Sequence, residues 1–485
     1  MANLVAPQPG PEGFPRAVAL PPDKLEAAHR ELVERFGPGR VLTDFRDRMA
    51  YAYDATGEKY PPDAVVFPLS TEDVADAVRI AARHGLPVIA RGGGTNISGG
   101  TIPVTGGLCL AMNRMDRILA IDTENHTATV QPGLRNLALQ EALRPHGFFF
   151  APDPSSHRVS TVGGNAGENA GGPHCLKYGV TVNHVLGLTV VLADGEVVRL
   201  GGPEQDRPGY DLVSLLVGSE GTLGVITELV VRILPLPPVV RTLLAIFDDL
   251  EVAMQTVSDI IAARVVPATM ELLDRGTIEV VERYARAGYP EDAEAVLLIE
   301  VDGPEESVAD ELARVEAVCR RNGVRELRVA KTEAEREALW LGRRAAYGAA
   351  GRLSAHVWTQ DVTVPRDRLV EMLRTVQAIG RKYGIRLINV AHAGDGNLHP
   401  LVAYDPQDAD EIRRMKAADQ EILAACVALG GSISGEHGIG IDKLPNLELQ
   451  LGPDLLGLMW SVRQAFDPAL RLNPGKAVAA PRRNV

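Results

Sequence analysis

The stretch PLSTEDVADAVRIAARHGLPVIARGGGTN (residues 68–96) predicts a helix, a short strand and a glycine-rich loop in direct succession. Ser70 can cap the helix, and apolar residues from Val74 onward recur at i, i+3, i+4 and i+7, which gives the helix one apolar face. Gly85 is suited to ending the helix because glycine adopts the left-handed conformation without a steric penalty. LPVIA then predicts a buried strand that runs into the loop Arg91–Asn96.

Strands and turns continue from this unit to about Leu234, where Leu-Pro-Leu-Pro-Pro (234–238) forms a stiff break. Because 485 residues exceed one ordinary core, we expect a domain boundary there. Beyond it, strands such as AVLLIEV (295–301) alternate with long amphipathic helices, which indicates a sheet covered by helices. At the other end, Pro22–Phe36 predicts a helix and the first fifteen residues predict a frayed arm.

Three loops rich in small residues lie in the first half of the chain: 91–96, 152–172 and 218–224. The backbone N–H groups of such loops can form nests for phosphate oxygens, and glycine permits the close approach. A single loop of this kind is more often a tight turn, but three of them favour a long phosphate-bearing ligand. Neither GxGxxG nor GxxxxGK[ST] occurs, which argues against a Rossmann nicotinamide site and a P-loop.

The second half carries two polar motifs, HAGDGNLH (392–399) and SGEHGIG (434–440). Histidine nitrogens suit zinc, manganese or iron, and a carboxylate is a compatible third ligand. His392 and His399 can converge if the segments around the Gly-Asp-Gly turn form a hairpin, with Glu436 as the candidate third ligand. The spacing supports equally well a pair of histidines that only make hydrogen bonds within a glycine-rich turn.

Composition excludes several classes of protein. The net charge of −13 argues against nucleic-acid binding, which needs a surplus of Lys and Arg, but leaves small anions open. The four cysteines, Cys109, Cys175, Cys319 and Cys426, are far apart, so an iron–sulfur cluster or four-cysteine zinc site within the chain is not expected. The chain has no run of about 18 apolar residues and opens without signal-peptide features. We therefore expect a cytoplasmic protein, either free or attached to the inner face of the membrane through a partner.

Residues 68–100, TVGGNAGENAGG (161–172), 177–198 and GSEGTLGVITE (218–228) resemble the FAD domain of the vanillyl-alcohol oxidase superfamily. The resemblance is strongest to the group of glycolate oxidase flavoprotein subunits, D-lactate dehydrogenases and D-2-hydroxyglutarate dehydrogenases, and it runs from about residue 40 to Lys476. It implies an α+β fold, with a PCMH-type FAD-binding domain of two α/β subdomains and a larger cap domain that has an antiparallel sheet and helices. The expected domains are 1–236 for the arm and FAD-binding domain, 237–465 for the cap, and 466–485 for a segment that returns to the FAD domain.

In that superfamily the first two glycine loops wrap the FAD pyrophosphate, and the GSEGTLGVIT segment lies on the adenine-ribose side. Some members link flavin to a histidine beside the first loop, whereas Thr95 and Asn96 follow the glycines here, so we expect non-covalent FAD. The resemblance implies that FAD is bound by Arg91, Gly92, Gly93, Gly94, Thr95, Asn96, Pro152, Asp153, Ser155, Thr161, Gly164, Asn165, Gly172, Gly218, Glu220, Gly221, Gly224, Val225, Ile226 and Asn473.

The resemblance also assigns roles in the second half. It implies that His392, His399 and Glu436 hold a divalent metal, zinc or manganese, and that His437 is the catalytic base. Arg343 matches the arginine that binds the substrate carboxylate.

Tyr347, one helical turn beyond Arg343, could line the same pocket, whereas the adjacent Arg344 is expected at the surface. The hydroxyglutarate dehydrogenases have threonine and lysine contacts that this chain does not match; Tyr347 and Thr359 fall nearby instead. This departure from the dicarboxylate-binding pattern favours a short substrate.

The expected reaction is oxidation of a small 2-hydroxy acid, such as glycolate or D-lactate, to the 2-oxo acid with hydride transfer to flavin N5. Electrons would pass to an acceptor other than nicotinamide: a quinone, or an iron–sulfur or second flavin-type subunit of a glycolate oxidase complex. A homodimer is also compatible with the sequence. Two alternatives are a non-catalytic FAD-binding subunit of such a complex and an FAD alcohol oxidase that needs no metal.

Overall fold

The predicted succession of helix, strand and loop is present in the computed structural model. Helix α3 (Thr71–His84) begins after Ser70, whose hydroxyl accepts a backbone hydrogen bond at 3.2 Å, and Gly85 ends the helix with a φ of 73°. Strand β3 (Val88–Arg91) follows. The helix expected near the N-terminus is α1 (Pro22–Phe36). Local patterns therefore predicted these elements correctly.

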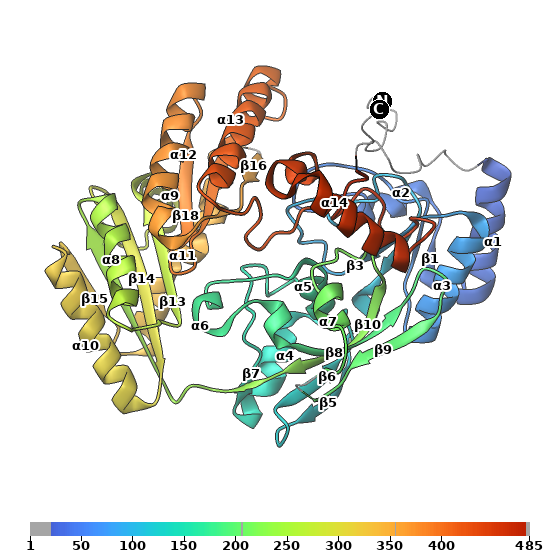
Figure 1. Cartoon of the computed structure of the whole chain (residues 1–485), viewed down its shortest axis with the longest axis horizontal. Coiled ribbons are helices and arrows are strands. Elements are labelled where there is room, and N and C mark those ends of the chain that lie inside the picture. The colour runs from blue at the N-terminus through green and yellow to red at the C-terminus, as the bar shows by residue number, and fades with distance from the viewer. Residues whose placement is uncertain (1–20, 205–206, 355, 482–485) are drawn as a thin grey trace. The chain divides into compact units, whose positions relative to one another are not determined.

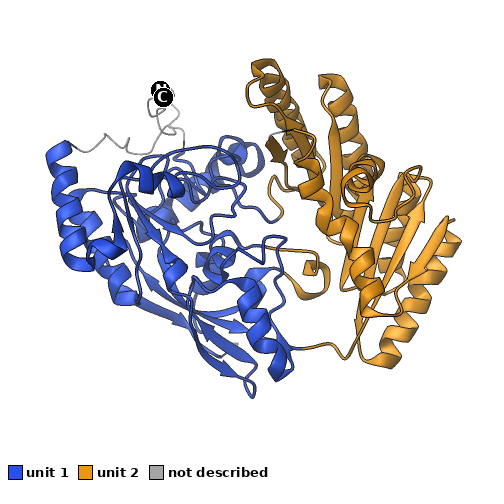
Figure 2. Ribbon diagram, turned by 180° about the vertical axis from the view of Figure 1, so that it is seen from behind, with its two compact units in different colours: residues 1–170, 180–235, 436–485 blue, residues 171–179, 236–435 orange. Residues whose placement is uncertain are grey.

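The structure describes residues 21–204, 207–354 and 356–481, so the predicted arm of the first fifteen residues lies outside the described part. The chain divides into two compact units (Figure 2), and each is described by itself. Unit 1 contains residues 1–170, 180–235 and 436–485, and unit 2 contains residues 171–179 and 236–435.

Unit 1 is built on two main sheets. The first has the strand order β1-β2-β4-β3, in which β4 runs parallel to both neighbours and β1 pairs antiparallel with β2. Helices α1 and α3 pack against it through a core that includes Leu32, Val78 and Leu110. The other strands of this sheet are β1 (Val41–Leu42), β2 (Ala64–Val66) and β4 (Leu108–Ala111). A short helix, α2 (Phe45–Arg48), follows β1.

The second sheet of unit 1 is antiparallel throughout, in the order β5-β6-β10-β8-β9. Its core includes Leu139 of α4, Val162 of α5 and Leu229 of β10. Strands β7 and β11 form a separate antiparallel pair. The bounds are β5 (Ile118–Asp122), β6 (Thr127–Val130), α4 (Asn136–Leu143), β7 (Phe148–Phe149), α5 (Val162–Glu168), β8 (Val185–Val191), β9 (Val197–Gly201), α7 (Leu212–Leu216), β10 (Val225–Arg232) and β11 (Leu234–Pro235).

Unit 2 is an antiparallel sheet in the order β15-β12-β14-β13-β18-β19-β16, with β17 paired to β19 (Figure 1). Helices α9 and α11 pack on one face through a core that includes Ile278, Leu298 and Trp340. The strands are β12 (Val239–Phe247), β13 (Thr269–Asp274), β14 (Ala295–Gly303), β15 (Glu326–Val329), β16 (His356–Thr359), β17 (Val362–Thr363), β18 (Leu387–His392) and β19 (Asn397–Tyr404). The helices are α6 (Cys175–Tyr178), α8 (Leu250–Ala262), α9 (Arg275–Ala285), α10 (Glu305–Arg321), α11 (Glu333–Ala350), α12 (Leu369–Tyr383) and α13 (Ala409–Ala428). The predicted α+β class, with an antiparallel sheet and helices in the second half, is confirmed.

Residues 171–179 interrupt unit 1 and belong to unit 2. Lys177 Nζ donates to the backbone carbonyl of Asp302 on β14 at 2.6 Å and pairs with its carboxylate, while the Tyr178 hydroxyl donates to the same carboxylate at 2.6 Å. The two ends of the excursion meet in unit 1, where Thr181 donates to the Ala170 carbonyl through both its N–H and its hydroxyl. Gly172, predicted to bind FAD, therefore lies in unit 2.

The chain returns to unit 1 at Glu436, earlier than the expected segment 466–485. The expected returning segment 466–485 lies wholly within unit 1, which also includes the glycine loop before helix α14 (Leu447–Phe466). The end of the chain is fixed by backbone bonds: Asn473 N–H donates to the Val88 carbonyl at 2.8 Å.

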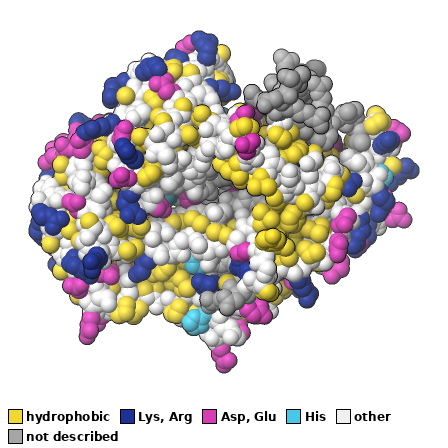
Figure 3. All heavy atoms as spheres, in the orientation of Figure 1, with side chains coloured by type: hydrophobic (Ala, Val, Ile, Leu, Met, Phe, Trp, Pro, Cys, Tyr) yellow, Lys and Arg dark blue, Asp and Glu magenta, His cyan; other side chains and the backbone are white. Residues whose placement is uncertain are grey.

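Within the described residues, no helix is long and apolar enough to cross a bilayer. Helix α14 nevertheless exposes several large apolar side chains, and Figure 3 shows hydrophobic side chains gathered over this helix. The exposed residues are Leu449, Leu455, Leu458 and Met459.

A buried carboxylate, Glu300 on β14, connects several parts of unit 2. Arg336 donates to both of its oxygens at 2.9 Å, Trp340 Nε1 donates at 3.0 Å, and the hydroxyl of Thr242 donates to the same carboxylate. His174 Nε2 lies 3.4 Å from it. Burial alone would raise the pKa of Glu300, but the hydrogen bonds from His174 and Arg336 hold that pKa well below its usual range.

We predict that Arg336→Met lowers the free energy of unfolding by about 3 kcal/mol or more at pH 7, because it leaves the Glu300 carboxylate buried without its main counter-charge. A carboxyl with a lowered folded-state pKa stabilises above its unfolded pKa, and this stabilisation is lost as the pH falls through the folded-state value. The difference from wild type should therefore shrink in acid. Chemical denaturation at pH 7 and pH 4 measures both effects. Arg413→Met, which removes an exposed pair with Asp410, is the control and should cost less than about 0.5 kcal/mol. Equal losses in the two variants would contradict the prediction.

Candidate functional site

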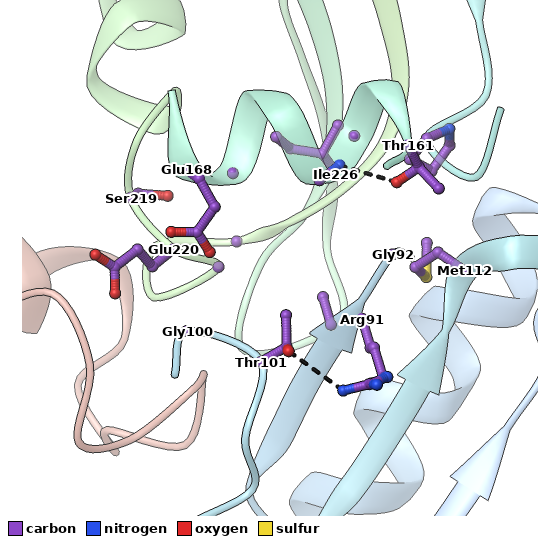
Figure 4. A pocket seen from close by; sticks show the side chains of 17 residues that line it. Arg91, Gly92, Gly100, Thr101, Met112, Thr161, Glu168, Ser219, Glu220 and Ile226 are labelled. Atoms are coloured by element: carbon purple, nitrogen blue, oxygen red, sulfur yellow. Dashed lines mark hydrogen bonds between the residues drawn. The ribbon is translucent and has the colours of Figure 1, made fainter. Parts of the chain in front are cut away.

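A pocket in unit 1 lies among the three glycine loops (Figure 4). Glu168 and Glu220 lie on one side of it, and Arg91 and Thr101 lie on another, joined by a hydrogen bond of 3.2 Å. Helix α5 forms a wall. The lining residues are Ala90, Arg91, Gly92, Gly100, Thr101, Met112, Pro132, Thr161, Gly163, Gly164, Gly167, Glu168, Ser219, Glu220, Gly221, Gly224 and Ile226.

The glycines of this pocket are required by close backbone approaches. A Cβ on Gly92 would overlap the Thr161 hydroxyl, a Cβ on Gly93 would lie 2.6 Å from the Val159 carbonyl, and one on Gly163 would overlap Pro132. Since real Cβ atoms do not approach so closely, larger residues cannot be accommodated without moving the loops. The result is a wall of exposed backbone, which suits a ligand that needs many N–H donors.

Helix α5 begins at this wall. The hydroxyl of Thr161 accepts a hydrogen bond from Gly164 N–H at 3.1 Å and so caps the helix. The first N–H groups of the helix are used within the protein, since Val162 donates to the Leu134 carbonyl at 2.8 Å and Gly163 to the Pro132 carbonyl at 2.9 Å. These bonds fix the wall against which the glycine loops expose their backbone. Together these features provide a cradle for phosphate oxygens in unit 1.

Eight of the residues expected to bind FAD line this pocket: Arg91, Gly92, Thr161, Gly164, Glu220, Gly221, Gly224 and Ile226. The other expected residues of unit 1 lie in the same loops or behind them: Gly93, Gly94, Thr95, Asn96, Pro152, Asp153, Ser155, Asn165, Gly218, Val225 and Asn473. Some of these support the walls. Asn96 Oδ1 accepts the N–H groups of Ser98 and Gly100 at 2.9 and 2.7 Å, and Asn473 Nδ2 donates to the carbonyls of Gly100 and Glu220.

Sequence reasoning missed several lining residues, among them Gly100, Thr101, Met112 and Glu168. Glu168 lies within the quoted motif TVGGNAGENAGG, and its position among small residues was the available signal. Met112 gave no local signal, because it reaches the pocket only through the packing of the short turn after β4.

In unit 2, the histidines of the HAGDGNLH motif converge as the hairpin hypothesis predicted. Strands β18 and β19 pair antiparallel, with His392 opposite Asn397 and His399 opposite Val390. This register places both histidines on one face as diagonal neighbours, with ring centroids 5.1 Å apart.

Glu271 on the neighbouring strand β13 joins this pair to Arg343. His392 Nδ1 lies 2.6 Å from Glu271 Oε1, and Arg343 Nε donates to Glu271 Oε2. Burial would raise the pKa of Glu271, but the charges of Arg343 and His392 lower it to about 2, so the group is an ionised carboxylate. The sequence gave no sign of Glu271, because a single acid in the buried strand TMELLD resembles an ordinary strand residue.

Asp361 is the second buried acid near the histidines. Its Oδ1 lies 3.8 Å from His399 Nδ1, and its Oδ2 accepts the Ser434 hydroxyl at 3.0 Å and the Gly435 N–H at 2.9 Å. Asp361 therefore fixes the chain at the residue that directly precedes Glu436.

The remaining expected residues are Tyr347, Arg344, Glu436 and His437. Tyr347 follows Arg343 by one turn of α11 and is 47% exposed, while Arg344 pairs with Glu337 at the surface as expected. Glu436 and His437 are the first two residues of the returning part of unit 1. The His437 carbonyl accepts the Ser98 hydroxyl at 3.0 Å.

Comparison with known proteins agrees with this geometry. Residues 62–201 match the family model of an FAD binding domain, and residues 236–477 match that of FAD linked oxidases, C-terminal domain. The chain is 45% identical to the glycolate oxidase subunit GlcD of Bacillus subtilis over 451 residues, which cover 93% of this chain and 96% of that one. It is 33% identical to a D-lactate dehydrogenase of Anaerostipes hadrus over 460 residues, 92% of this chain and 97% of that one.

Among solved structures, p-cresol methylhydroxylase with substrate bound has a TM-score of 0.82 at 18% identity, covering 95% of this chain and 98% of that one. At this identity the likeness concerns the fold. It agrees with the expected PCMH-type architecture.

The residues of the pocket in unit 1 fit FAD. The glycine walls leave backbone exposed where a diphosphate requires donors, and the Arg91 guanidinium supplies a positive charge beside the pocket. The polar end and the apolar lining from Met112 and Ile226 match a ligand that is part diphosphate and part ring.

Gly167 allows a test of cofactor binding that is separate from folding. It lines the pocket from α5, and a Cβ at this position would meet no described protein atom within 4 Å. Gly167→Ala should therefore stabilise the apo-protein slightly, by up to about 1 kcal/mol, yet weaken FAD binding about tenfold or more because the methyl group enters the cofactor's space. FAD titration of apo-protein and thermal unfolding measure the two effects. Gly457→Ala on α14 also meets no atom within 4 Å and is the control, with FAD affinity unchanged. Unchanged FAD affinity in Gly167→Ala would show that the cofactor does not occupy this pocket.

Proposed function

The chain belongs to the FAD-linked oxidases of the vanillyl-alcohol oxidase superfamily and is an FAD-dependent hydroxy-acid oxidoreductase, and we propose that its substrate is a short 2-hydroxy acid such as glycolate or D-lactate. The observation that carries this proposal is the row Arg343, Glu271 and His392 in unit 2. It brings a cation for a carboxylate next to imidazoles that can act on a neighbouring hydroxyl.

Arg343 is the proposed anchor of the substrate carboxylate. Its side chain is only 11% exposed, and its Nε is engaged by Glu271, which fixes the plane of the guanidinium. The two terminal nitrogens can then form the bidentate pair that arginine makes with carboxylates. Tyr347, one turn away on α11, is proposed to line the same site.

His392, His399 and Glu436 are the proposed ligands of a divalent metal, zinc or manganese. Glu271 occupies His392 Nδ1 and so orients Nε2 as a ligand atom, which is the usual arrangement of a carboxylate behind a metal-bound histidine. Asp361 lies beside His399 and holds Gly435, the residue before Glu436. A metal held by these three residues would lower the pKa of the substrate 2-hydroxyl.

His437 is the proposed base that takes the hydroxyl proton. The cofactor that we propose for the pocket of unit 1 is FAD held without a covalent link, and it would supply the acceptor for the hydride of substrate C2. Arg343 holds the substrate by its carboxylate, so that the hydroxyl rather than the acid end is presented to the base.

The reduced protein must pass its electrons on, and we propose that the acceptor is a quinone or an iron–sulfur or second flavin-type subunit. The word "subunit" in the name of the Bacillus relative supports an assembly, and the exposed apolar residues of α14 offer a surface for a partner. A homodimer is the simpler assembly. The cytoplasmic location, and attachment to the membrane through a partner, stay predictions.

Two alternatives make different demands on these residues. A non-catalytic FAD-binding subunit has no need for a buried arginine and two convergent histidines, all of which this chain has. An FAD alcohol oxidase without metal would have no use for a carboxylate that orients His392 and a second carboxylate 3.8 Å from His399. Reduction of bound flavin by a panel of 2-hydroxy acids, with and without a chelator, separates the three functions.

We predict that Arg343→Lys lowers kcat/KM for 2-hydroxy acids by about 1.5–3 kcal/mol of transition-state binding, because an ammonium lacks the guanidinium fork. FAD content should stay at the wild-type level. Steady-state kinetics with glycolate and D-lactate measure the loss. Arg344→Lys, which alters only the exposed pair with Glu337, is the matched control. Unaltered kcat/KM in Arg343→Lys would remove this arginine from the substrate site.

The metal ligands and the base should fail in different ways. His392→Ala and His399→Ala should lose bound metal and slow flavin reduction together, with partial rescue by added metal. His437→Ala should keep metal and FAD, yet reduce its flavin roughly 10²–10⁴-fold more slowly, as expected for a lost general base. Elemental analysis beside anaerobic reduction rates makes the comparison.

His356→Ala is the control for the metal experiment, since His356 lies on β16 in the same sheet and packs against Tyr404. It should keep both metal and rate. Wild-type protein that carries no metal, ignores chelators and gains nothing from zinc or manganese would refute the metal site.

A further inference from the structure

Glu168 is the last residue of α5, at the far end of the helix from the phosphate cradle. Six residues separate Val162 from Glu168, which at 1.5 Å per residue corresponds to about 9 Å along the helix. The side chain lines the pocket in Figure 4, on the same side as Glu220. The carboxyl therefore faces the ligand at a point well removed from the diphosphate.

The surroundings of Glu168 are tight. A Cβ on Gly100 would lie 2.5 Å from Glu168 Oε1, and a Cβ on Gly438 would overlap Oε2. Glycine at both positions makes room for this carboxyl. Among the described residues Oε2 is buried and has no hydrogen-bond partner.

The two neighbouring carboxyls differ in the donors they receive. Glu220 accepts the N–H groups of Ile439 at 2.7 Å, of Gly440 at 2.9 Å and of Ala477 at 3.2 Å. For Glu168, the side chain of Asn96 is the donor among the described residues, and Oε2 receives none. An ionised carboxylate needs donors for its lone pairs. Burial raises the pKa of Glu220 as well, but its backbone donors oppose that rise, so the geometry places the charge on Glu220 and the proton on Glu168.

The other charged groups that face Glu168 are consistent with this assignment. Burial, followed by the charges of Glu220 and Asp54, raises the pKa of Glu168 well above its usual range. Arg463 acts on Glu220, and Lys476 is the cation that acts on both carboxyls. Burial lowers its pKa to about 7, and its ammonium donates to the Ile102 carbonyl at 2.7 Å.

We propose that Glu168 is a neutral carboxylic acid whose O–H donates a hydrogen bond to the flavin ring of bound FAD and so positions the ring and raises its reduction potential. A neutral donor avoids the repulsion that a carboxylate would meet from an electron-rich ring, and it satisfies the otherwise unpartnered Oε2. The choice of the flavin ring over the adenine rests on the proposed function, because Gly438 directly follows His437, the proposed base.

The experiment compares Glu168→Ala and Glu168→Gln with wild type in binding and in potential. Apo-protein is titrated with FAD and, separately, with ADP, and the potential of the holo-protein is measured with dyes rather than with substrate. Removing the donor in Glu168→Ala should weaken FAD binding about two- to tenfold and leave ADP binding unchanged. A hydrogen bond to the charged, reduced ring is roughly twice as strong as one to the neutral ring. Its loss should therefore favour the oxidised form about tenfold, which lowers the reduction potential by ~30 mV.

Glu168→Gln separates a neutral acid from a carboxylate. The amide keeps a donor and the same charge as the protonated acid, so FAD affinity and potential should stay within about twofold of wild type. An ionised Glu168 would instead give a marked rise in potential in this variant. Glu141→Gln on α4, an exposed position outside the pocket, is the control.

Three results would overturn the proposal: an unchanged potential in Glu168→Ala, equal weakening of ADP and FAD, or a shift in Glu168→Gln as large as that in Glu168→Ala. Because none of these readouts uses a 2-hydroxy acid, they are independent of the proposed substrate. Failure to oxidise any hydroxy acid would defeat the proposed function while leaving the effect on potential measurable.

Discussion

The carboxylate of Glu220 accepts backbone hydrogen bonds from three residues of the returning chain, Ile439, Gly440 and Ala477. Its own backbone carbonyl accepts the side-chain amide of Asn473 at 2.6 Å. Hydrogen bonds to a charged group contribute about 1.5–3 kcal/mol each. Together they are enough to hold the returning segment in unit 1 after some 200 residues of unit 2. The backbone of Glu220 adopts a φ of 53°, a conformation that costs energy for a side chain other than glycine. The cost is offset because this conformation directs both the carboxylate and the carbonyl to the same returning segment.

Unit 2 uses a buried carboxylate in a similar way. Glu271 contacts both Arg343 and His392, so one anion sets the plane of a guanidinium and the tautomer of an imidazole. An unpaired buried charge is expensive, and each of these three groups is stabilised only while the other two are present. The arrangement is therefore rigid before any substrate arrives, which reduces the ordering that binding must bring about.

The sequence predicted what depends on neighbours along the chain. The cap at Ser70, the end at Gly85 and the convergence of His392 with His399 all follow from local spacing, and all are present. It could not predict Glu271 or Asp361, because each is one acid in an otherwise ordinary segment and gains its role from strands far away in sequence. The same reason explains Gly172. Its motif continues smoothly from the cofactor loop, and contacts of the segment with Glu300 and Asp302, more than 120 residues later, place it in unit 2.

The excursion 171–179 carries the chain from unit 1 into unit 2 and back. It begins directly after α5, the helix that carries Thr161 and Glu168, and its ends are held together by Thr181 and Ala170. Its tip is fixed to β14, which pairs with β13 in a register that places Glu300 opposite Thr269. Glu271 lies two residues beyond Thr269 on that same strand. Residues 171–179 thus run from the end of α5 and are held to β14 by hydrogen bonds to Asp302, and β14 pairs with the strand that carries Glu271, the carboxylate that orients Arg343 and His392.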